Sequence, residues 1–555
     1  MPISKTNLFK GLALFLLAAL VFLPLGAAEF LLWDDQIHLS QNPFFSPFSW
    51  QSLLDIWTTP YPVGPSLYIP VTYSFWGLLA PFSQNFTVAW PFLLLNFAIH
   101  LVNAALVYRL LNRLVPSLEK NALLFGVLIF VFHPLQVESV VWMSGFKDMV
   151  WVTFALLTLL AYLRKNLALT YTGLILAILC KPIAVVIPLM ILGLEFFMAP
   201  EKKTRQRLLY LGSLFAVALP FMFLTKILQP DVLVRNIPAL WERPVVALDA
   251  LGFYLKKVFL PVGFGPDYGR RPDLVLEHFP TYELVLPVLF VGILAWFSKV
   301  APELKKTFWL AGLFLLVPLL PVLGFVPFQF QNFSTVADRY FYFSMVGIGL
   351  LAAVAYTKLP RAKWVLVALL PVFMGLSHFF SQYWRTNQEL FTHALVINPD
   401  SKSAGNNLGI ILSQKNQLKE ALPYFQHVYE VYPDNFAAAN NIGIIYLRLG
   451  EIDKAISHYV NNLKVFPTNT DARISYGELL MQMNKDEEAL AQLRQATEQT
   501  PSNAYGWYMY SQILWKTGQR EESLQHLKKA IEIEPFNEGF KKRLEDFNTL
   551  IQLNK

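Results

Sequence analysis

Five prolines recur every 34 residues near the end of this 555-residue chain, at Pro399, Pro433, Pro467, Pro501 and Pro535. Glycine, asparagine and other small residues keep the same register. One shared position suits a close approach of two helices, and it holds Gly409, Gly443, Gly477 and Ser511. A second suits a turn with left-handed backbone, and it holds Asn416, Gly450, Asn484 and Gly518. A third, small position holds Ala421, Ala455, Ala489 and Ser523. A period of this kind indicates helix pairs that stack on their neighbours to bury their apolar sides.

The 34-residue period is that of the tetratricopeptide repeat (TPR). Residues 386–555 are therefore predicted to form a TPR domain. It begins with a half repeat from Asn387 to Pro399, continues with four full repeats, and ends with a C-terminal capping helix. Such an array is an all-α solenoid whose concave surface can hold a polypeptide.

The residues before the repeats are too apolar for a water-soluble protein. The whole chain is 55% hydrophobic and only 15% charged, and the repeats are densely charged whereas long stretches before Phe380 carry no charge. About 11 stretches are predicted to cross a membrane as helices. They lie near Gly11–Ala28, Phe86–Tyr108, Asn121–Phe132, Met149–Leu163, Leu167–Leu179, Ile183–Met198, Leu208–Leu228, Tyr282–Phe297, Phe308–Phe328, Tyr340–Tyr356 and Trp364–Phe380. We read the first as an uncleaved helix rather than a signal peptide. Residues 1–385 are thus predicted to be a polytopic membrane domain with a large outer loop at 29–85.

Basic residues predict the orientation of this domain. With the N-terminus in the cytoplasm, every inner loop is basic, as the positive-inside rule requires. These residues are Arg109, Arg113 and Lys120; Arg164 and Lys165; Lys202, Lys203, Arg205 and Arg207; Lys299, Lys305 and Lys306; and Lys358, Arg361 and Lys363. The apolar piece Val245–Val262 breaks the pattern if it spans, so we interpret it as re-entrant or as lying on the outer surface. An odd number of spans then places the repeats outside the cytoplasm, with the periplasm of a bacterial inner membrane as the expected compartment.

Several classes of function find no motif in this sequence. No basic–aromatic module or groove-binding helix indicates nucleic-acid binding, and the net charge of +7 reports membrane orientation instead. The single cysteine, Cys180, excludes a disulfide within the chain. Walker, dinucleotide and Gly-x-Ser-x-Gly motifs are absent, as is Cys/His metal spacing, so we predict neither a cofactor nor a metal.

An adjacent acidic pair, Asp34 and Asp35, begins the first outer loop directly after the first span. Two carboxylates at a membrane edge lose solvation and repel each other, which raises at least one pKa and can produce a general base. The alternative is a solvated acidic pair or a helix N-cap. The sequence does not say which aspartate is the base.

A second group of candidates lies on the predicted outer side, at the ends of spans or, for Arg270 and Arg271, in the long fourth outer loop. Its members are His133, Glu138, Lys147, Asp148, Lys181, Arg270, Arg271, Asp338, Arg339 and Tyr340. Ionisable groups near or below the lipid headgroups are costly, so they are usually functional or paired with one another. The cations suit a lipid phosphate. The alternatives are a structural network, with Glu138 paired to Lys147 or Asp148 bound to a neighbouring helix, and interfacial snorkelling of Lys181.

Four of these motifs, in their order along the chain, resemble the transmembrane-and-TPR O-mannosyltransferases and their bacterial relatives. The motifs are Trp33-Asp34-Asp35 with Asn42, His133 through Asp148, Cys180-Lys181, and Ala337-Asp338-Arg339-Tyr340. The resemblance implies a GT-C glycosyltransferase fold, a catalytic role for Asp34 and Asp35, and a polyprenyl-phosphate-linked mannose as donor. Two positions depart from the family: Tyr68-Ile69-Pro70 lacks the usual arginine, and Pro182 stands where an acidic residue usually follows Cys-Lys.

The leading hypothesis is therefore the transfer of a sugar, with mannose implied, from a polyprenyl phosphate to Ser or Thr of a protein outside the cytoplasm. The repeats would hold the acceptor protein. One alternative acceptor is a lipid-linked or envelope glycan. A non-catalytic, membrane-anchored TPR scaffold and a transporter are alternatives of other classes. The identities of the sugar and the acceptor, the oligomeric state and any assistance by a divalent metal are not determined by the sequence.

Overall fold

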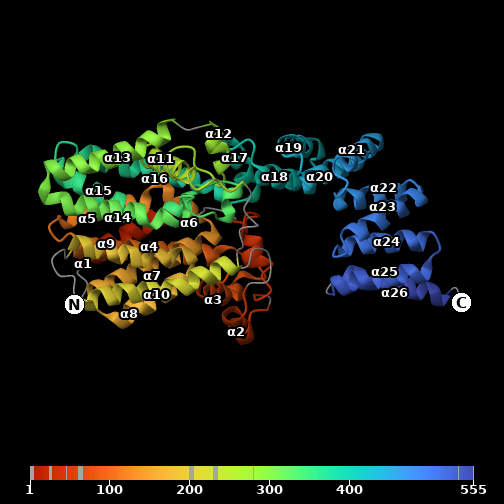
Figure 1. Ribbon diagram of the computed structural model, residues 1–555, viewed down its shortest axis with the longest axis horizontal. Helices are drawn as coiled ribbons and strands as arrows, with labels where there is room; N and C mark the ends of the chain where they lie inside the picture. Colours follow the sequence, from red (N-terminus) through yellow and green to blue (C-terminus); the bar gives the residue numbers. More distant parts are fainter. Residues whose placement is uncertain are drawn as a thin grey trace. The chain divides into compact units, whose positions relative to one another are not determined.

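The computed structural model describes residues 5–23, 28–45, 47–60, 67–198, 205–228, 236–278, 281–535 and 537–553. Within these ranges the chain is all-α, with no β-strand, as the sequence predicts (Figure 1). It divides into two compact units, Met1–Pro399 and Asp400–Lys555. The division follows helix α17 (Asn387–Ile397), whereas the boundary predicted from the repeat period precedes it.

The first unit is a bundle of apolar helices. Six are long and apolar enough to cross a membrane, and a seventh candidate is a pair bent by 54°, Lys120–Phe132 with Pro134–Val141. Four shorter apolar helices are Gly11–Phe22, Leu167–Cys180, Pro182–Phe196 and Met345–Lys358. Each of the 11 predicted spans overlaps one of these segments. The number of crossings itself stays a prediction, because four of the helices are too short to cross a ~30 Å core unaided.

Twelve helices of the described residues form the apolar bundle. They are α1 (Lys5–Phe22), α4 (Trp90–Leu114), α5 (Lys120–Phe132), α6 (Val137–Val141), α7 (Phe146–Leu163), α8 (Leu167–Cys180), α9 (Ile187–Met198), α10 (Arg205–Leu228), α13 (Thr281–Val300), α14 (Lys305–Leu316), α15 (Met345–Lys358) and α16 (Lys363–Ser381). The segment Met143–Leu163 is central, because 78% of its apolar stretch is buried inside the protein. Only 17% of the apolar stretch is buried in Arg207–Leu224 and in Glu283–Val300. These peripheral helices expose apolar faces that suit lipid contact.

Loops that the sequence assigns to one side of the membrane contact one another. On the predicted inner side, Arg113 donates to the carbonyl of Leu163 at 3.1 Å, and Lys358 pairs with Glu303 at 3.0 Å. On the predicted outer side, the Thr72 hydroxyl donates to the carbonyl of Cys180 at 2.9 Å. The grouping agrees with the alternation of predicted loops, although it does not say which end faces the cytoplasm. Lys202 and Lys203 of the third inner loop lie outside the described residues.

Polar side chains along α4 join it to other helices. Asn96 donates to the carbonyl of Trp142 at 2.6 Å, His100 lies 2.8 Å from the hydroxyl of Tyr342, and Asn103 donates to the carbonyl of Met149 at 3.0 Å. These three residues share one helix face. Their spacing predicts interhelical hydrogen bonding, and the structure confirms it.

The piece Val245–Val262 forms α11 (Arg243–Phe259), which packs against α13. The helices approach so closely that a Cβ on Gly252 would lie 2.1 Å from the carbonyl oxygen of Glu283. Its charged residue Asp249 is buried and paired with Arg270. Helix α11 does not meet the length and hydropathy criteria for a span. Its re-entrant or surface placement stays a prediction.

The outer-side connections contain short helices. They are α2 (Trp50–Thr58), α3 (Pro70–Leu79), α12 (Pro272–His278) and the single turns η3 (Pro134–Gln136), η5 (Pro182–Val186), η9 (Gln329–Asn332) and η10 (Asp338–Phe341). A further π-helical turn, η1 (Gln36–Ser40), directly follows the acidic pair. Short helices and turns of this kind hold polar residues on defined backbone rather than on free loops.

The second unit is the predicted solenoid. Its helices are α18 (Lys402–Gln414), α19 (Leu418–Val431), α20 (Phe436–Arg448), α21 (Ile452–Val465), α22 (Thr470–Gln482), α23 (Asp486–Gln499), α24 (Ala504–Lys516), α25 (Arg520–Ile533) and α26 (Glu538–Leu553). The turn residues Asn416, Gly450, Asn484 and Gly518 all have positive φ, between 59° and 85°. A Cβ on Gly443 would lie 2.2 Å from the ring of Tyr459. Both roles predicted for the repeated small residues are therefore confirmed.

Candidate active site

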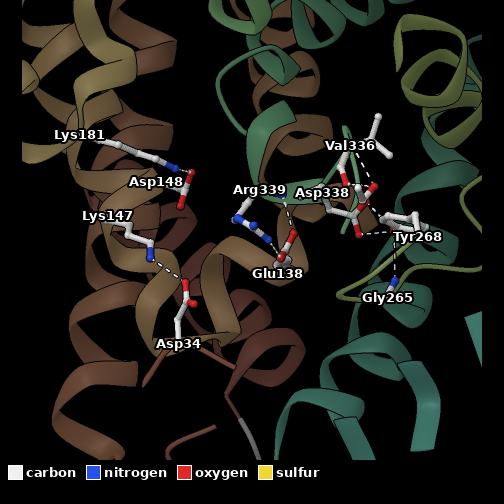
Figure 2. A network of polar contacts seen from close by, with 12 residues as sticks. Asp34, Glu138, Lys147, Asp148, Lys181, Gly265, Tyr268, Val336, Asp338 and Arg339 are labelled. Carbon is white, nitrogen blue, oxygen red and sulfur yellow. Dashed lines mark hydrogen bonds and ion pairs between the residues drawn. The ribbon is translucent and has the colours of Figure 1, made fainter. Parts of the chain in front are cut away.

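The predicted outer end of the bundle holds three ion pairs, and each joins two different segments (Figure 2). Lys147 of α7 donates to Asp34 of the first outer loop at 3.0 Å. Lys181, between α8 and η5, pairs with Asp148 of α7. Arg339 of η10 pairs with Glu138 of α6 at 2.5 Å. Segments up to 201 residues apart thus meet in one cluster.

Asp34 is the more accessible carboxylate of the acidic pair. Its side chain is 36% exposed, while its partner Lys147 is 10% exposed. Burial raises the pKa of Asp34, but the charges of Lys147 and Arg339 and the hydrogen bond from Lys147 outweigh this effect, and the pKa lies below its ordinary value. Asp34 is therefore ionised at neutral pH and held by a cation in the structure.

Asp35 has a different environment from its neighbour. It is fully buried and accepts hydrogen bonds from the Ser144 hydroxyl at 2.5 Å, the Ser144 amide at 3.0 Å and the Leu31 amide at 2.9 Å. Burial raises the pKa of Asp35 to about 6 despite these bonds. These hydrogen bonds join the loop to the start of α7, and the catalytic role of Asp35 stays a prediction.

Arg339 is the most enclosed cation of the cluster. Its guanidinium donates a hydrogen bond to the Glu138 carboxylate, and its backbone amide donates to the same carboxylate at 2.8 Å. The rings of Phe330, Tyr340 and Trp142 lie 4.3, 4.9 and 5.4 Å from the guanidinium carbon. Cation–π contacts of this kind hold a guanidinium in a fixed orientation.

The lysines of the cluster are less enclosed than Arg339. Lys181 retains 18% exposure, and its ammonium lies 5.4 Å from the ring centre of Tyr340. The charges of Lys147 and Arg339 both act on Lys181, so the three cations lie within electrostatic reach of one another. Oδ2 of Asp148 is buried without a hydrogen-bond partner among the described residues. The ammonium of Lys181 is thus held through one carboxylate oxygen only.

Asp338 extends the cluster toward a second loop. Both of its carboxylate oxygens lie within hydrogen-bond distance of the Tyr268 hydroxyl, at 2.7 and 2.8 Å. Burial and the charge of Glu138 raise the pKa of Asp338 to about 8. Figure 2 shows Asp338 and Tyr268 beside the Arg339–Glu138 pair. Asp338 therefore serves to connect loops and carries a proton near neutral pH.

Three predicted residues lie in other arrangements. Arg270 pairs with Asp249 and, at 3.1 Å, with Glu283. Arg271 pairs with Asp273 at 3.1 Å. His133 is fully buried, and its ring nitrogens contact the amide of Leu135 and the carbonyl of Val258. These contacts do not include the residues of the three ion pairs, and a role of Arg270, Arg271 or His133 in donor binding stays a prediction.

Pairing differs from the network that the sequence suggested. Glu138 pairs with Arg339 and not with Lys147, while Asp148 does bind a residue of another segment, Lys181. His38 was not among the predicted residues, yet it lies one turn after Asp34, and its Nδ1 is 3.0 Å from the Tyr73 hydroxyl. Burial and the charge of Lys147 lower the pKa of His38 to about 3, so the imidazole is neutral. The sequence feature that could have identified His38 as a site residue is its position four residues after Asp34, one helical turn away.

No group of three or more His, Cys, Asp or Glu side chains within the described ranges has the arrangement of a metal site. The cluster offers an accessible carboxylate, Asp34, paired with Lys147, and two further cations, Lys181 and Arg339. A base of this kind can take a proton, and the cations can stabilise an anion that forms within their reach.

Comparison with known proteins agrees with both parts of the chain. Three family models for the tetratricopeptide repeat match residues 406–461, 455–513 and 504–537. The protein O-mannosyl-transferase TMTC3 of Homo sapiens is 22% identical over 384 residues, which cover 60% of this chain and 41% of that protein. The corresponding protein of Mus musculus is 23% identical with the same coverage. The chain is therefore distantly similar to these O-mannosyl-transferases. The resemblance predicted from the motif order is thereby confirmed.

The chain spans about two fifths of the length of these curated relatives. Its apolar helices and the relatives together indicate a multi-pass membrane protein with a TPR unit. Solved TPR structures are also similar. YrrB, titled a TPR protein with an unusual peptide-binding site, is 23% identical over 31% of this chain and 89% of its own, with a TM-score of 0.24. A thermophilic TPR protein of Thermus thermophilus, TTC0263, is 18% identical over 32% of this chain and 93% of its own, with a TM-score of 0.28.

Proposed function

We propose that this protein is a membrane glycosyltransferase that moves one sugar from a polyprenyl-phosphate donor to a Ser or Thr hydroxyl of a protein. The observation that carries the proposal is one accessible carboxylate, Asp34, paired with Lys147 in a cluster that also holds Lys181 and Arg339, at the predicted outer end of an apolar bundle. The relationship to protein O-mannosyl-transferases supports the reaction class and favours mannose as the sugar.

The reaction is an inverting displacement at the anomeric carbon. Asp34 accepts the proton of the acceptor hydroxyl. The oxygen of that hydroxyl forms the new bond to the anomeric carbon. The bond between that carbon and the phosphate oxygen breaks, and its electron pair leaves with the polyprenyl phosphate. Lys147, Lys181 and Arg339 are assigned to the phosphate, because cations that meet developing negative charge lower the barrier. Asp35 holds the loop in place and is not the base.

Donor binding also activates the base in this mechanism. A phosphate drawn to Lys147 competes with Asp34 for the same ammonium. Loss of that ion pair removes the main electrostatic cause that lowers the pKa of Asp34, so the carboxylate becomes a stronger base. The acceptor hydroxyl is therefore deprotonated only when a donor is bound, so the acceptor is not activated in the absence of a sugar to transfer.

The expected setting follows from the orientation of the basic loops. We assign the site and the repeats to the outer face of a bacterial inner membrane, with the repeats holding the acceptor polypeptide. A lipid-linked or envelope glycan as acceptor would use the same donor site. Transfer assays with peptide and glycan acceptors side by side distinguish these two acceptors.

The deciding experiment measures sugar transfer from a polyprenyl-phosphate donor by purified full-length variants. A general base contributes about 10²–10⁴-fold to a rate, so Asp34→Asn is expected to lower kcat by that factor while the protein stays folded. Glu303→Gln, at an exposed ion pair of the other end of the bundle, is the matched control and keeps full activity. Full activity of the Asp34→Asn/Asp35→Asn double variant would end this mechanism and promote the scaffold alternative.

A further inference from the structure

Helix α17 contacts two of the loops that form the candidate site, although it shares the proline register of the repeats. It belongs to the first unit, packs against the turn η11 (Gln382–Trp384) that follows α16, and begins at Asn387 (Figure 1). The N-cap Thr386 accepts from the amide of Glu389 and fixes the helix start. The position of Asn387 in the first turn is thereby set by the backbone.

On one side, Asn387 binds the backbone directly before the acidic pair. Its side-chain oxygen accepts from the Leu32 amide at 2.6 Å, and its side-chain nitrogen donates to the carbonyl of Phe30 at 3.2 Å and to Glu29 at 2.8 Å. The Asn387 amide also donates to Glu29 at 2.9 Å, and the Glu29 amide donates to the carbonyl of Arg385 at 2.9 Å. Every hydrogen-bonding group of this amide side chain therefore has a partner in residues 29–32.

The held segment leads straight into the candidate base. The Leu31 amide donates to Asp35, and the Asp35 amide donates back to the carbonyl of Leu31 at 3.2 Å. The ring of Trp33 lies 6.3 Å from that of Phe391 of α17. A shift of residues 29–32 would thus move both carboxylates. Leu31 is hydrogen-bonded to Asp35, and Leu32 is hydrogen-bonded to Asn387.

On its other side, α17 supports the loop that carries Tyr268. His393 lies 2.6 Å from the carbonyl of Phe264 and stacks on Tyr383 at 3.7 Å. A Cβ on Gly265 would lie 2.9 Å from Ile397, so the loop backbone contacts the helix. The Gly265 amide in turn donates to the Tyr268 hydroxyl at 3.1 Å. Helix α17 therefore contacts both the Asp34 loop and the loop that binds Asp338.

We propose that Asn387 is a positioning residue, which fixes the backbone of residues 29–32 and thereby places Asp34 opposite Lys147. On this assignment α17 acts as part of the catalytic unit rather than as a repeat helix. The inference rests on the proposed transferase function for its catalytic consequence. Its structural part, the hold on Leu32, does not depend on that function.

The test uses full-length variants and two measurements. Asn387→Ala removes the acceptor of the Leu32 amide, so hydrogen exchange of residues 30–35 is expected to accelerate about tenfold. The kcat for transfer from a polyprenyl-phosphate mannose donor should fall about tenfold, whereas the KM for that donor stays unchanged because no cation moves. Thr392→Ala, on the exposed face of the same helix, is the control and leaves both measurements unchanged.

A paired substitution keeps the proposal testable if Asn387→Ala folds poorly. Asn387→Asp brings two carboxylates together at Glu29 and is expected to accelerate exchange. Adding Glu29→Gln restores a donor to the pair and should recover part of the protection and part of kcat. Unchanged exchange in Asn387→Ala, or faster exchange with unchanged kcat, would overturn the positioning role. A full-length protein without any transfer would refute the proposed function instead, and the exchange data alone would then decide whether Asn387 holds the loop.

Discussion

Lys147 is the residue whose replacement most directly tests the link between donor and base. Its charge lowers the pKa of Asp34, so Lys147→Gln lets that pKa rise. The acid limb of kcat/KM is then expected to move to higher pH, and the KM for the donor should rise because a phosphate contact is lost. Lys120→Gln, an exposed lysine at the opposite end of the bundle, is the control. An acid limb that stays in place would contradict the role given to this ion pair.

Asp338 predicts a pH dependence of stability. Burial raises its pKa to about 8, above the ordinary value near 3.8, so the folded chain binds a proton that the unfolded chain has released. Stability is therefore complete below about pH 4 for this group and falls as the pH rises toward 8. Between pH 6 and 9, the unaltered chain should lose melting temperature, and Asp338→Asn should flatten that decline. Exposed Asp546→Asn is the control, and an equal decline in all three proteins would refute the assignment.

The sequence predicted which residue types form the site but not how they pair. Asp34, Lys147, Asp148, Lys181, Glu138 and Arg339 all fall in one cluster. Their partners could not be predicted, because a pair such as Arg339–Glu138 depends on how helices 201 residues apart pack. Arg270 shows the limit more strongly. Its place on the predicted outer side was the reason to include it, and its pairing with two acidic residues of α11 and α13 could not be predicted either.

The repeat helices offer a test at the scale of one element. Gly443 of α20 lies so close to Tyr459 of α21 that Gly443→Ala must push the ring aside. Overpacking of this kind costs about 1–3 kcal/mol, so the midpoint of urea unfolding of the repeat unit should fall. The third repeat uses Leu493 at the same place, which suggests Tyr459→Leu as a compensating change. If Gly443→Ala is equally destabilising with and without Tyr459→Leu, the ring contact is not the cause.

Local pattern explains why some elements were predicted well and others were not. Each repeat helix begins and ends within the 34-residue period, so its turns follow from glycine and asparagine at fixed positions. The span predictions also fall on apolar helices. Helix α17 carries a repeat-like proline at Pro399, but its partners are Glu29 and Phe264, far earlier in the chain. The 34-residue repeat period carries no information about contacts with residues so far apart in the chain.

At the scale of the whole molecule, contacts between loops define the two ends of the bundle. The basic residues of the loops predict which end faces the cytoplasm. Loops assigned to one side bind one another, which the sequence could only suggest. Which end faces the cytoplasm stays a prediction of the positive-inside rule, drawn from basic loops such as those with Arg109, Arg113, Lys305 and Lys306. Packing within the bundle is the same for either orientation.

Cysteine labelling decides the orientation. The only cysteine, Cys180, is buried, so Cys180→Ser gives a background without thiols. Single cysteines are then placed by exposed Thr59→Cys in the first outer loop, Lys306→Cys in a basic loop and Lys528→Cys in the repeats. A membrane-impermeant maleimide should label Thr59→Cys and Lys528→Cys in intact cells, and Lys306→Cys only after permeabilisation. If α11 crosses the membrane as a further span, Thr59→Cys and Lys528→Cys must lie on opposite sides. Labelling of only one of these two cysteines would therefore refute the re-entrant or surface placement of Val245–Val262, and labelling of Lys306→Cys alone would invert the whole topology.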